Sequence, residues 1–137
     1  MRDYQPKKKN PYWLEPTVYR CALAIVRDYP RLLAARDDIL HGSPVRSEGS
    51  GTPKGVPSDP TAQRALRLAR VESRIREIEA ALGMSPRRYR AAVLANILDE
   101  RRGVSRDFAA RRADCSASTI KHYRALLLWA IAGRLID

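Results

Sequence analysis

The sequence predicts an all-α protein, with a helical N-terminal unit, a flexible linker and a helical bundle. Apolar residues recur at spacings of three and four through most of the chain, and no segment alternates as a half-buried β-strand does. Hydrophobic residues make up 45% of the 137 residues, which is enough for a folded core. Proline and glycine gather at a few positions and divide the helical pattern into segments.

Residues 1–16 are predicted to form a basic aromatic arm. Three prolines exclude a continuous helix there, and Tyr4, Tyr12 and Trp13 stand near the lysines of residues 7–9. Aromatic rings among cations are found where proteins stack on nucleic-acid bases. They equally suit an arm that docks on its own domain, and we favour docking for Trp13.

Residues 17–40 are predicted to be an N-terminal helical unit. Thr17 is a plausible N-cap, and Pro30 must kink or end the helix. The apolar stripe before the proline is expected to contain Val18, Cys21, Ala22, Ile25 and Tyr29. After the proline, the apolar residues are Leu32, Leu33, Ala35, Ile39 and Leu40.

Residues 41–58 are rich in Gly, Ser and Pro and are predicted to be a linker. The helical domain of residues 59–137 follows. Its first helix, residues 59–83, has Ser58 or Asp59 as the cap and Gly83 at the end. The apolar positions of this helix form a heptad seam, which consists of Leu68, Val71, Ile75, Ile78 and Leu82.

Three further helices are predicted in this domain. The first spans residues 85–101, with Ser85 as the cap, and its buried face is expected to contain Tyr89, Val93, Leu94, Ile97 and Leu98. A short helix over residues 105–113 has Ser105 as its cap and Phe108, Ala109 and Ala113 on its inward face. The last helix runs from about residue 117 to residue 135 and is apolar on all sides, which predicts burial.

The chain is strongly basic. It has 26 Lys and Arg against 15 Asp and Glu, a formal net charge of +11, which favours a polyanionic partner such as DNA, RNA or an acidic membrane. Residues 84–137 carry +6 of this charge, whereas residues 59–83 carry +1. Because 21 of the basic residues are Arg, a general arginine bias is an alternative origin for part of the excess, but it does not predict this split.

Residues 105–134 have the layout of a helix-turn-helix. Ala110 is small enough for two helices to cross closely, and Asp114 tolerates the positive φ of a tight turn, although Gly is usual there. Cys115 is placed to pin the turn, Ser116 to cap the second helix and Ile120 to anchor it.

In such a motif the second helix enters the DNA major groove by its N-terminal turns. We therefore expect its exposed side chains to read or hold DNA, and expect nearby arginines to lie along the duplex backbone. The candidate DNA-binding residues are Ser116, Ala117, Ser118, Thr119, Lys121, His122, Arg111, Arg112 and Arg124. For His122 and for each arginine, a solvated helix surface is the alternative.

The sequence does not predict an enzyme. It has no Gly-rich phosphate loop and no catalytic constellation around its two histidines, His41 and His122. Cys21 and Cys115 lie far apart and outside any Cys/His cluster, so we expect reduced, partly buried thiols, no metal and no cofactor. No run of about 18 apolar residues is present, so no membrane partner is expected and the location is predicted to be cytoplasmic.

A family resemblance rests on residues 58–82, on Tyr89-Arg90, on residues 118–135, and on Tyr29-Pro30 in the N-terminal helix. On these residues the chain resembles the RinA/ArpU family of phage transcriptional regulators over about residues 17–135. The resemblance implies a C-terminal helix-turn-helix similar to region 4 of bacterial sigma factors. It also implies activation of late phage genes on host RNA polymerase, in the bacterial host cytoplasm. Asp114 departs from the family's usual glycine, and the arm is extra.

Together these observations predict a sequence-specific transcriptional activator that binds double-stranded DNA. A DNA-packaging recognition protein similar to a small terminase subunit is one alternative, because residues 68–82 or the C-terminal helix could form a homo-oligomer. A sigma/anti-sigma-type interaction module with incidental charge is the other.

Overall fold

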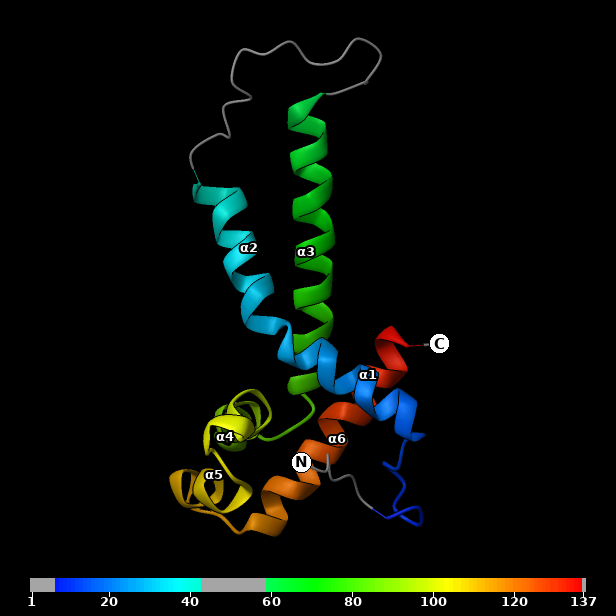
Figure 1. Ribbon diagram of the computed structural model, residues 1–137, viewed down its shortest axis with the longest axis vertical. Coiled ribbons are helices and arrows are strands. Elements are labelled where there is room, and N and C mark those ends of the chain that lie inside the picture. Colours follow the sequence, from blue (N-terminus) through cyan, green and yellow to red (C-terminus); the bar gives the residue numbers. More distant parts are fainter. Residues whose placement is uncertain (1–6, 43–58, 137) are drawn as a thin grey trace. The chain divides into compact units, whose positions relative to one another are not determined.

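A computed structural model describes residues 7–42 and 59–136, and every regular element in these residues is helical (Figure 1). The all-α class is therefore confirmed. The linker predicted for residues 41–58 lies outside the described residues, apart from its first two. The helices are α1 (Pro16–Arg27), α2 (Tyr29–His41), α3 (Pro60–Leu82), α4 (Arg87–Asp99), the 3-10 turn η1 (Glu100–Arg102), α5 (Arg106–Ala113) and α6 (Ala117–Leu135).

The chain forms two compact units, which divide it differently from the sequence prediction. One unit contains Met1–Tyr29 and Glu77–Asp137, and the other contains Pro30–Arg76. The predicted unit of residues 17–40 is therefore split, because α1 packs on α6 while α2 belongs to the second unit. The split falls at Pro30, next to the break between α1 and α2.

The second unit consists of α2 and residues 60–76 of α3. Asp59 caps α3, since its Oδ1 atom accepts a hydrogen bond from the Thr61 backbone N–H at 3.1 Å. The Arg64 Nε atom donates to the Ile39 carbonyl at 2.9 Å, which ties α3 to the end of α2. Ile39 and Ile75 are buried, and large hydrophobic side chains that stay exposed are Leu40 (49%) and Leu66 (57%).

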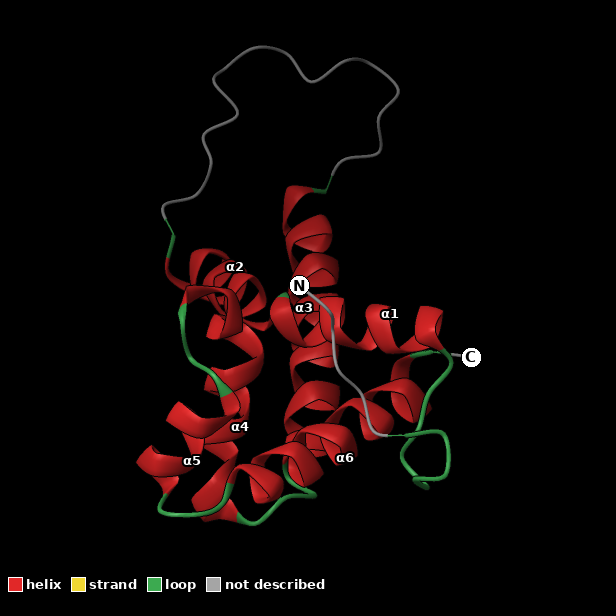
Figure 2. Ribbon diagram, turned by 60° about the horizontal axis from the view of Figure 1, so that its bottom comes forward, coloured by secondary structure: helices red, strands yellow, loops and turns green. Residues whose placement is uncertain are grey.

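The first unit is built around α6, which packs on α1, α4 and α5 (Figure 2). Its buried apolar side chains include Ile120, Leu126, Leu127, Leu128 and Ile131. The expectation that α6 is buried on all sides is wrong at Trp129, which is 41% exposed. Of the helices in the two described ranges, none is long and apolar enough to cross a membrane.

The predicted burial needs correction at several positions. The buried face of α1 consists of Tyr19, Ala22, Leu23 and Val26, so the expected stripe is rotated, and Cys21 is an exposed free thiol. Tyr19, Ala22, Leu23 and Val26 also recur at helical spacing, so the sequence contains this second apolar stripe on a neighbouring side of α1. Phe108, expected to point inward, is 40% exposed, whereas Ala109 is buried as expected.

Two predicted caps are also wrong. Glu15 precedes α1, which starts at Pro16 with no side-chain cap, so Thr17 lies inside the helix. Helix α4 starts after Pro86, and Ser85 is buried with a hydroxyl that finds no partner among the described residues. In α1, Pro16 occupies the first helical position, where its fixed φ suits the helix and its missing N–H is no loss. In α4, Pro86 takes the cap position itself and has no side-chain group that accepts a hydrogen bond.

Candidate nucleic-acid interface

Helices α5 and α6 are joined by a tight turn of Asp114, Cys115 and Ser116. Asp114 has φ 53° and ψ 52°, and it is the only non-glycine residue with positive φ in the part of the chain that the structure describes. The Cys115 N–H donates to the Ala110 carbonyl at 2.9 Å, which closes the end of α5. The left-handed conformation expected for Asp114 is therefore present.

Small and β-branched residues hold the two helices together. Ala109 and Ala110 of α5 are 1% and 3% exposed, and Ile120 of α6 is fully buried. Methyl side chains let the two backbones approach closely, while Ile120 fills the space between them. Cys115 is half-buried at the turn, as expected of a residue that pins it.

Serine hydroxyls cap both helices. The Ser105 Oγ atom accepts from the Phe108 N–H at 3.1 Å, and the Ser116 Oγ atom accepts from the Thr119 N–H at 3.1 Å. The Ser116 and Thr119 hydroxyls also lie 2.9 Å apart, within hydrogen-bonding distance. Both predicted caps are confirmed.

The first turns of α6 present polar side chains to solvent. Ser116, Ser118, Lys121 and His122 are exposed, whereas Ala117 and Thr119 are half-buried. The N-terminal end of a helix carries a partial positive charge and free backbone N–H groups, so this end of α6 favours an anion. The turn and these side chains together make a small, positively polarised surface.

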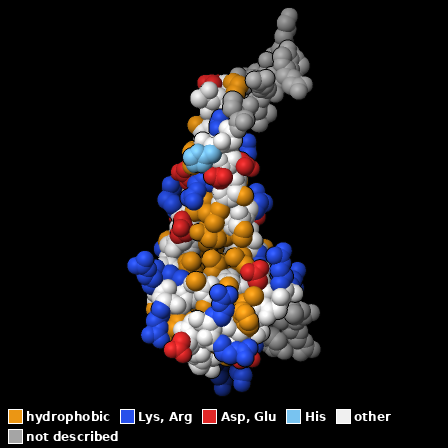
Figure 3. All heavy atoms as spheres, turned by 90° about the vertical axis from the view of Figure 1, so that its left-hand side faces the viewer, with side chains coloured by type: hydrophobic (Ala, Val, Ile, Leu, Met, Phe, Trp, Pro, Cys, Tyr) orange, Lys and Arg blue, Asp and Glu red, His pale blue; other side chains and the backbone are white. Residues whose placement is uncertain are grey.

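Basic side chains surround this surface. Arg111 and Arg112 are exposed at the end of α5, and exposed arginines elsewhere in α4 and η1 are Arg87, Arg88, Arg101 and Arg102. Figure 3 shows Lys and Arg side chains spread over the lower part of one face, which α4 and α5 form. Around the α5–α6 turn these basic side chains outnumber the exposed acidic ones, Asp107 and Asp114, which favours an anionic partner.

Arg124 does not belong to that exposed surface, contrary to the sequence prediction. It is 4% exposed, and its Nη1 atom donates to Asn96 Oδ1 at 2.7 Å while Nη2 lies 3.1 Å from Glu100 Oε2. The Asn96 Nδ2 atom in turn donates to the Val104 carbonyl at 2.9 Å, next to the start of α5. Arg124 therefore joins α6 to α4 and to the segment before α5, and it cannot lie along a duplex.

Asn96 and Glu100 are residues that sequence reasoning missed. The available signal was helical spacing, because Arg124 stands four residues after the buried Ile120 and so shares its face. A charged side chain on a buried face needs a partner, and Glu100 also lies 3.7 Å from Arg27 of α1.

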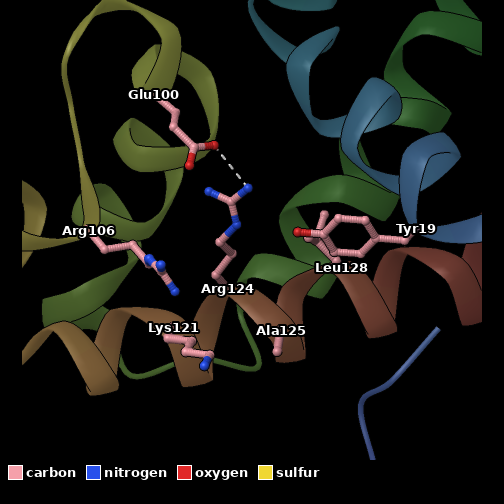
Figure 4. Close-up of a pocket in the computed structure, with 7 residues that line it drawn as sticks. All are labelled: Tyr19, Glu100, Arg106, Lys121, Arg124, Ala125 and Leu128. Carbon is pink, nitrogen blue, oxygen red and sulfur yellow. Dashed lines mark ion pairs between the residues drawn. The ribbon is translucent and has the colours of Figure 1, made fainter. Parts of the chain in front are cut away.

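A shallow depression lies beside Arg124 (Figure 4). The side chain of Arg106, from the start of α5, extends toward α6 near Lys121, while Arg124 turns toward Glu100. Arg106 and Lys121 therefore line the same depression. The lining residues are Tyr19, Glu100, Arg106, Lys121, Arg124, Ala125 and Leu128.

The N-terminal arm docks on α6, and the docking residue is Tyr12. Its ring centroid lies 5.8 Å from that of His122 and 5.5 Å from that of Trp129. Trp13, for which docking was expected, is half-buried and has the Lys8 Nζ atom 5.6 Å from its ring centroid. His122 is thus part of an aromatic cluster as well as of the exposed surface.

In residues 7–42 and 59–136, no group of three or more His, Cys, Asp or Glu side chains is arranged to hold a metal ion. Comparison of the chain with family models, with curated proteins and with solved structures finds no match.

Proposed function

We propose that the protein binds double-stranded DNA in a sequence-specific way and regulates transcription. The observation that carries this proposal is the α5–turn–α6 unit, in which a left-handed Asp114 and the cap Ser116 start a helix whose first turns expose Ser118, Lys121 and His122. This arrangement matches the demands of a helix-turn-helix, whose second helix enters the major groove.

In this proposal α6 lies in the major groove with its N-terminal turns against the base edges. Lys121 donates to guanine acceptors, and Ser118 bonds a base edge or a phosphate. Arg111 and Arg112, at the end of α5, lie along the phosphates beside the groove. Arg124 acts indirectly, because its bonds to Asn96 and Glu100 hold α6 at a set angle to α4.

The regulatory part of the proposal rests on the resemblance to the RinA/ArpU family. It implies that the chain activates late phage genes together with host RNA polymerase. The basic surface around the turn supports the DNA-binding step of such a function.

DNA selection tests the proposal. The full-length protein is used to select its best site from random duplexes, and affinity for that site and for an unselected duplex is then measured with Ser118→Ala/Lys121→Ala. We expect selectivity to fall at least about tenfold, because lost base contacts discriminate between sequences. Affinity for the unselected duplex should fall less. Loss of the single Lys121 charge makes the slope of log affinity against log salt shallower by only about one.

A matched control is Ser73→Ala/Arg70→Ala, which removes one exposed hydroxyl and one exposed arginine from α3. This variant should bind both duplexes as the wild type does. Wild-type protein without any salt-dependent DNA binding would refute the proposal, and equal selectivity of the α6 variant and the wild type would refute the role of α6.

The mass in solution separates this function from DNA packaging. A regulator of this kind is expected to be a monomer or a small oligomer. A closed ring of many subunits would contradict the proposal and favour a protein similar to a small terminase subunit.

A further inference from the structure

Residues 7–13 of the N-terminal arm are folded, and Tyr12 packs against α6. The Asn10 N–H donates to the Lys7 carbonyl at 2.8 Å, and the Trp13 N–H donates to the Asn10 carbonyl at 3.0 Å. The Asn10 side chain accepts from the Tyr12 N–H at 2.8 Å. Two consecutive turns therefore set the direction of the arm where it meets α6.

Tyr12 anchors the arm next to the proposed DNA-reading residues. Its ring contacts His122, which belongs to the exposed first turns of α6, and Trp129, which lies further along the same helix. Aromatic pairs at these separations contribute beyond the area that they bury. Figures 1 and 2 both draw the described part of the arm, residues 7–15, beside α6.

The anchored arm places three cations near that surface. Lys7, Lys8 and Lys9 are exposed, and Lys9 stands three residues before Tyr12. Because an extended chain spans at most about 3.6 Å per residue, the Lys9 Cα atom lies within roughly 11 Å of the Tyr12 Cα atom. Ser116, Ser118, Lys121 and His122 remain exposed beside the docked arm, so the arm leaves the DNA-reading turns open.

We propose that the docked arm is a second DNA-binding element, in which Lys7, Lys8 and Lys9 hold backbone phosphates next to the groove that α6 occupies. Tyr12 is its positioning residue. This inference rests on the proposed function, and it assigns the chemistry of a further site: phosphate contacts that strengthen binding without reading sequence.

The salt dependence of DNA affinity tests this inference on the full-length protein and a short duplex of mixed sequence. For Lys7→Ala/Lys8→Ala/Lys9→Ala we expect the slope of log affinity against log salt to become shallower by about 2 to 3. Affinity in about 0.1 M salt should fall at least roughly tenfold. Selectivity between the best site and the mixed duplex should stay as in the wild type.

A control variant of equal charge is Arg67→Ala/Arg70→Ala/Arg76→Ala. It removes three exposed cations from α3 in the other unit, and we expect the slope of the wild type. If the control variant lost as much salt slope and DNA affinity as the lysine variant, the inference would be overturned, because the change in total charge would then explain both losses.

Tyr12 variants test the positioning role. Tyr12→Ala keeps every charge but removes the anchor, so both affinity and slope should fall toward those of the triple lysine variant. Tyr12→Phe keeps the ring and should behave as the wild type. Circular dichroism checks the fold, and because Tyr12 lies outside all helices, the helix content should not change.

The outcomes separate the two proposals. Wild-type protein that binds no duplex in a salt-dependent way refutes the proposed function itself. If the wild type binds DNA and the lysine variant has the same slope, only the arm inference fails. The arm inference also fails if Tyr12→Ala binds DNA as the wild type does. It fails as well if the arm variants bind DNA more tightly than the wild type, because the arm would then block DNA binding.

Discussion

Asp114 carries the left-handed turn between α5 and α6. For an L-residue this conformation costs roughly 1–2 kcal/mol, and Asp and Asn tolerate it better than other non-glycine residues because their short side chains bond locally. With φ 53° and ψ 52°, Asp114 directs the chain out of α5 so that Ser116 can cap α6. Asp114 therefore contributes to the angle between the two helices.

Substitution of Asp114 should reveal this conformational cost. Asp114→Gly should raise the free energy of unfolding by about 0.5 kcal/mol, because glycine adopts positive φ without steric cost. Asp114→Ala should lower it by about 0.5–1 kcal/mol. Urea unfolding measures both changes, and an alanine variant more stable than the glycine variant would contradict the argument.

Arg124 is the other residue on which the angle of α6 depends. Its guanidinium reaches Asn96 and Glu100 from a buried position, and so connects α6 to α4 and η1. A second arginine of α6, Arg134, pairs with Glu77 at 3.0 Å, but at exposures of 41% and 37%. The nitrogen–oxygen distances of the Arg124–Glu100 and Arg134–Glu77 pairs are almost the same, and the two pairs differ mainly in burial.

Because the two pairs differ in burial, we expect them to contribute unequally to the free energy of unfolding. Arg124→Met should lower the free energy of unfolding by about 2 kcal/mol, because Asn96 and Glu100 lose a charged donor inside the protein. Arg134→Met should cost less than about 1 kcal/mol, since exposed pairs are screened by water. Thermal or urea unfolding of both variants gives the comparison, and equal losses would mean that burial is not the deciding factor.

At the scale of the element, α5 and α6 start in the same way. Each has a serine cap whose hydroxyl accepts from the N–H three residues later at 3.1 Å. Ser105 begins α5 and Ser116 begins α6, so only Ser116 stands at the end that we propose to meet DNA. The two caps are thus a matched pair with different expected functions.

Alanine at each cap should separate stability from binding. Ser105→Ala and Ser116→Ala should each lower the free energy of unfolding by about 1 kcal/mol, because one helix N–H loses its acceptor. Ser116→Ala should also weaken binding to the selected DNA site, whereas Ser105→Ala should not. DNA affinity is measured at a temperature at which both variants are fully folded. Equal losses of affinity would mean that Ser116 does not contact DNA.

For the whole molecule, the distribution of charge matters more than its total. Lys7, Lys8, Lys9, Arg111, Arg112 and Lys121 are exposed in the unit that contains α6. The other unit also has exposed arginines on α3, but it contains neither α6 nor the arm. A net charge of +11 therefore does not measure the number of phosphate contacts.

The salt dependence of wild-type DNA binding should reflect the six exposed cations that we place at the DNA surface, Lys7, Lys8, Lys9, Arg111, Arg112 and Lys121. With one phosphate for each, the slope of log affinity against log salt should be about −5. Equilibrium titrations over a series of salt concentrations measure it. A slope near zero would mean that the basic residues serve another purpose.

Several features of the candidate interface could be predicted from local sequence alone. The bounds of α6, the caps Ser105 and Ser116, and the left-handed Asp114 all depend on residues within one or two helical turns. The partners of Arg124 could not be predicted in this way, because Asn96 and Glu100 come from another helix and the turn after it. The docking of Tyr12 likewise depends on rings that stand more than a hundred residues away.

The chain alone therefore specifies an all-helical protein, most of its helix boundaries and the turn between α5 and α6, since propensity, capping and positive φ act locally. Tertiary structure alone decides which side of α1 is buried, that α1 joins the C-terminal helices, and which groups pair with Arg124. These outcomes depend on burying apolar area and pairing a buried charge between distant segments. Such terms exceed the small local differences between one helical face and the next.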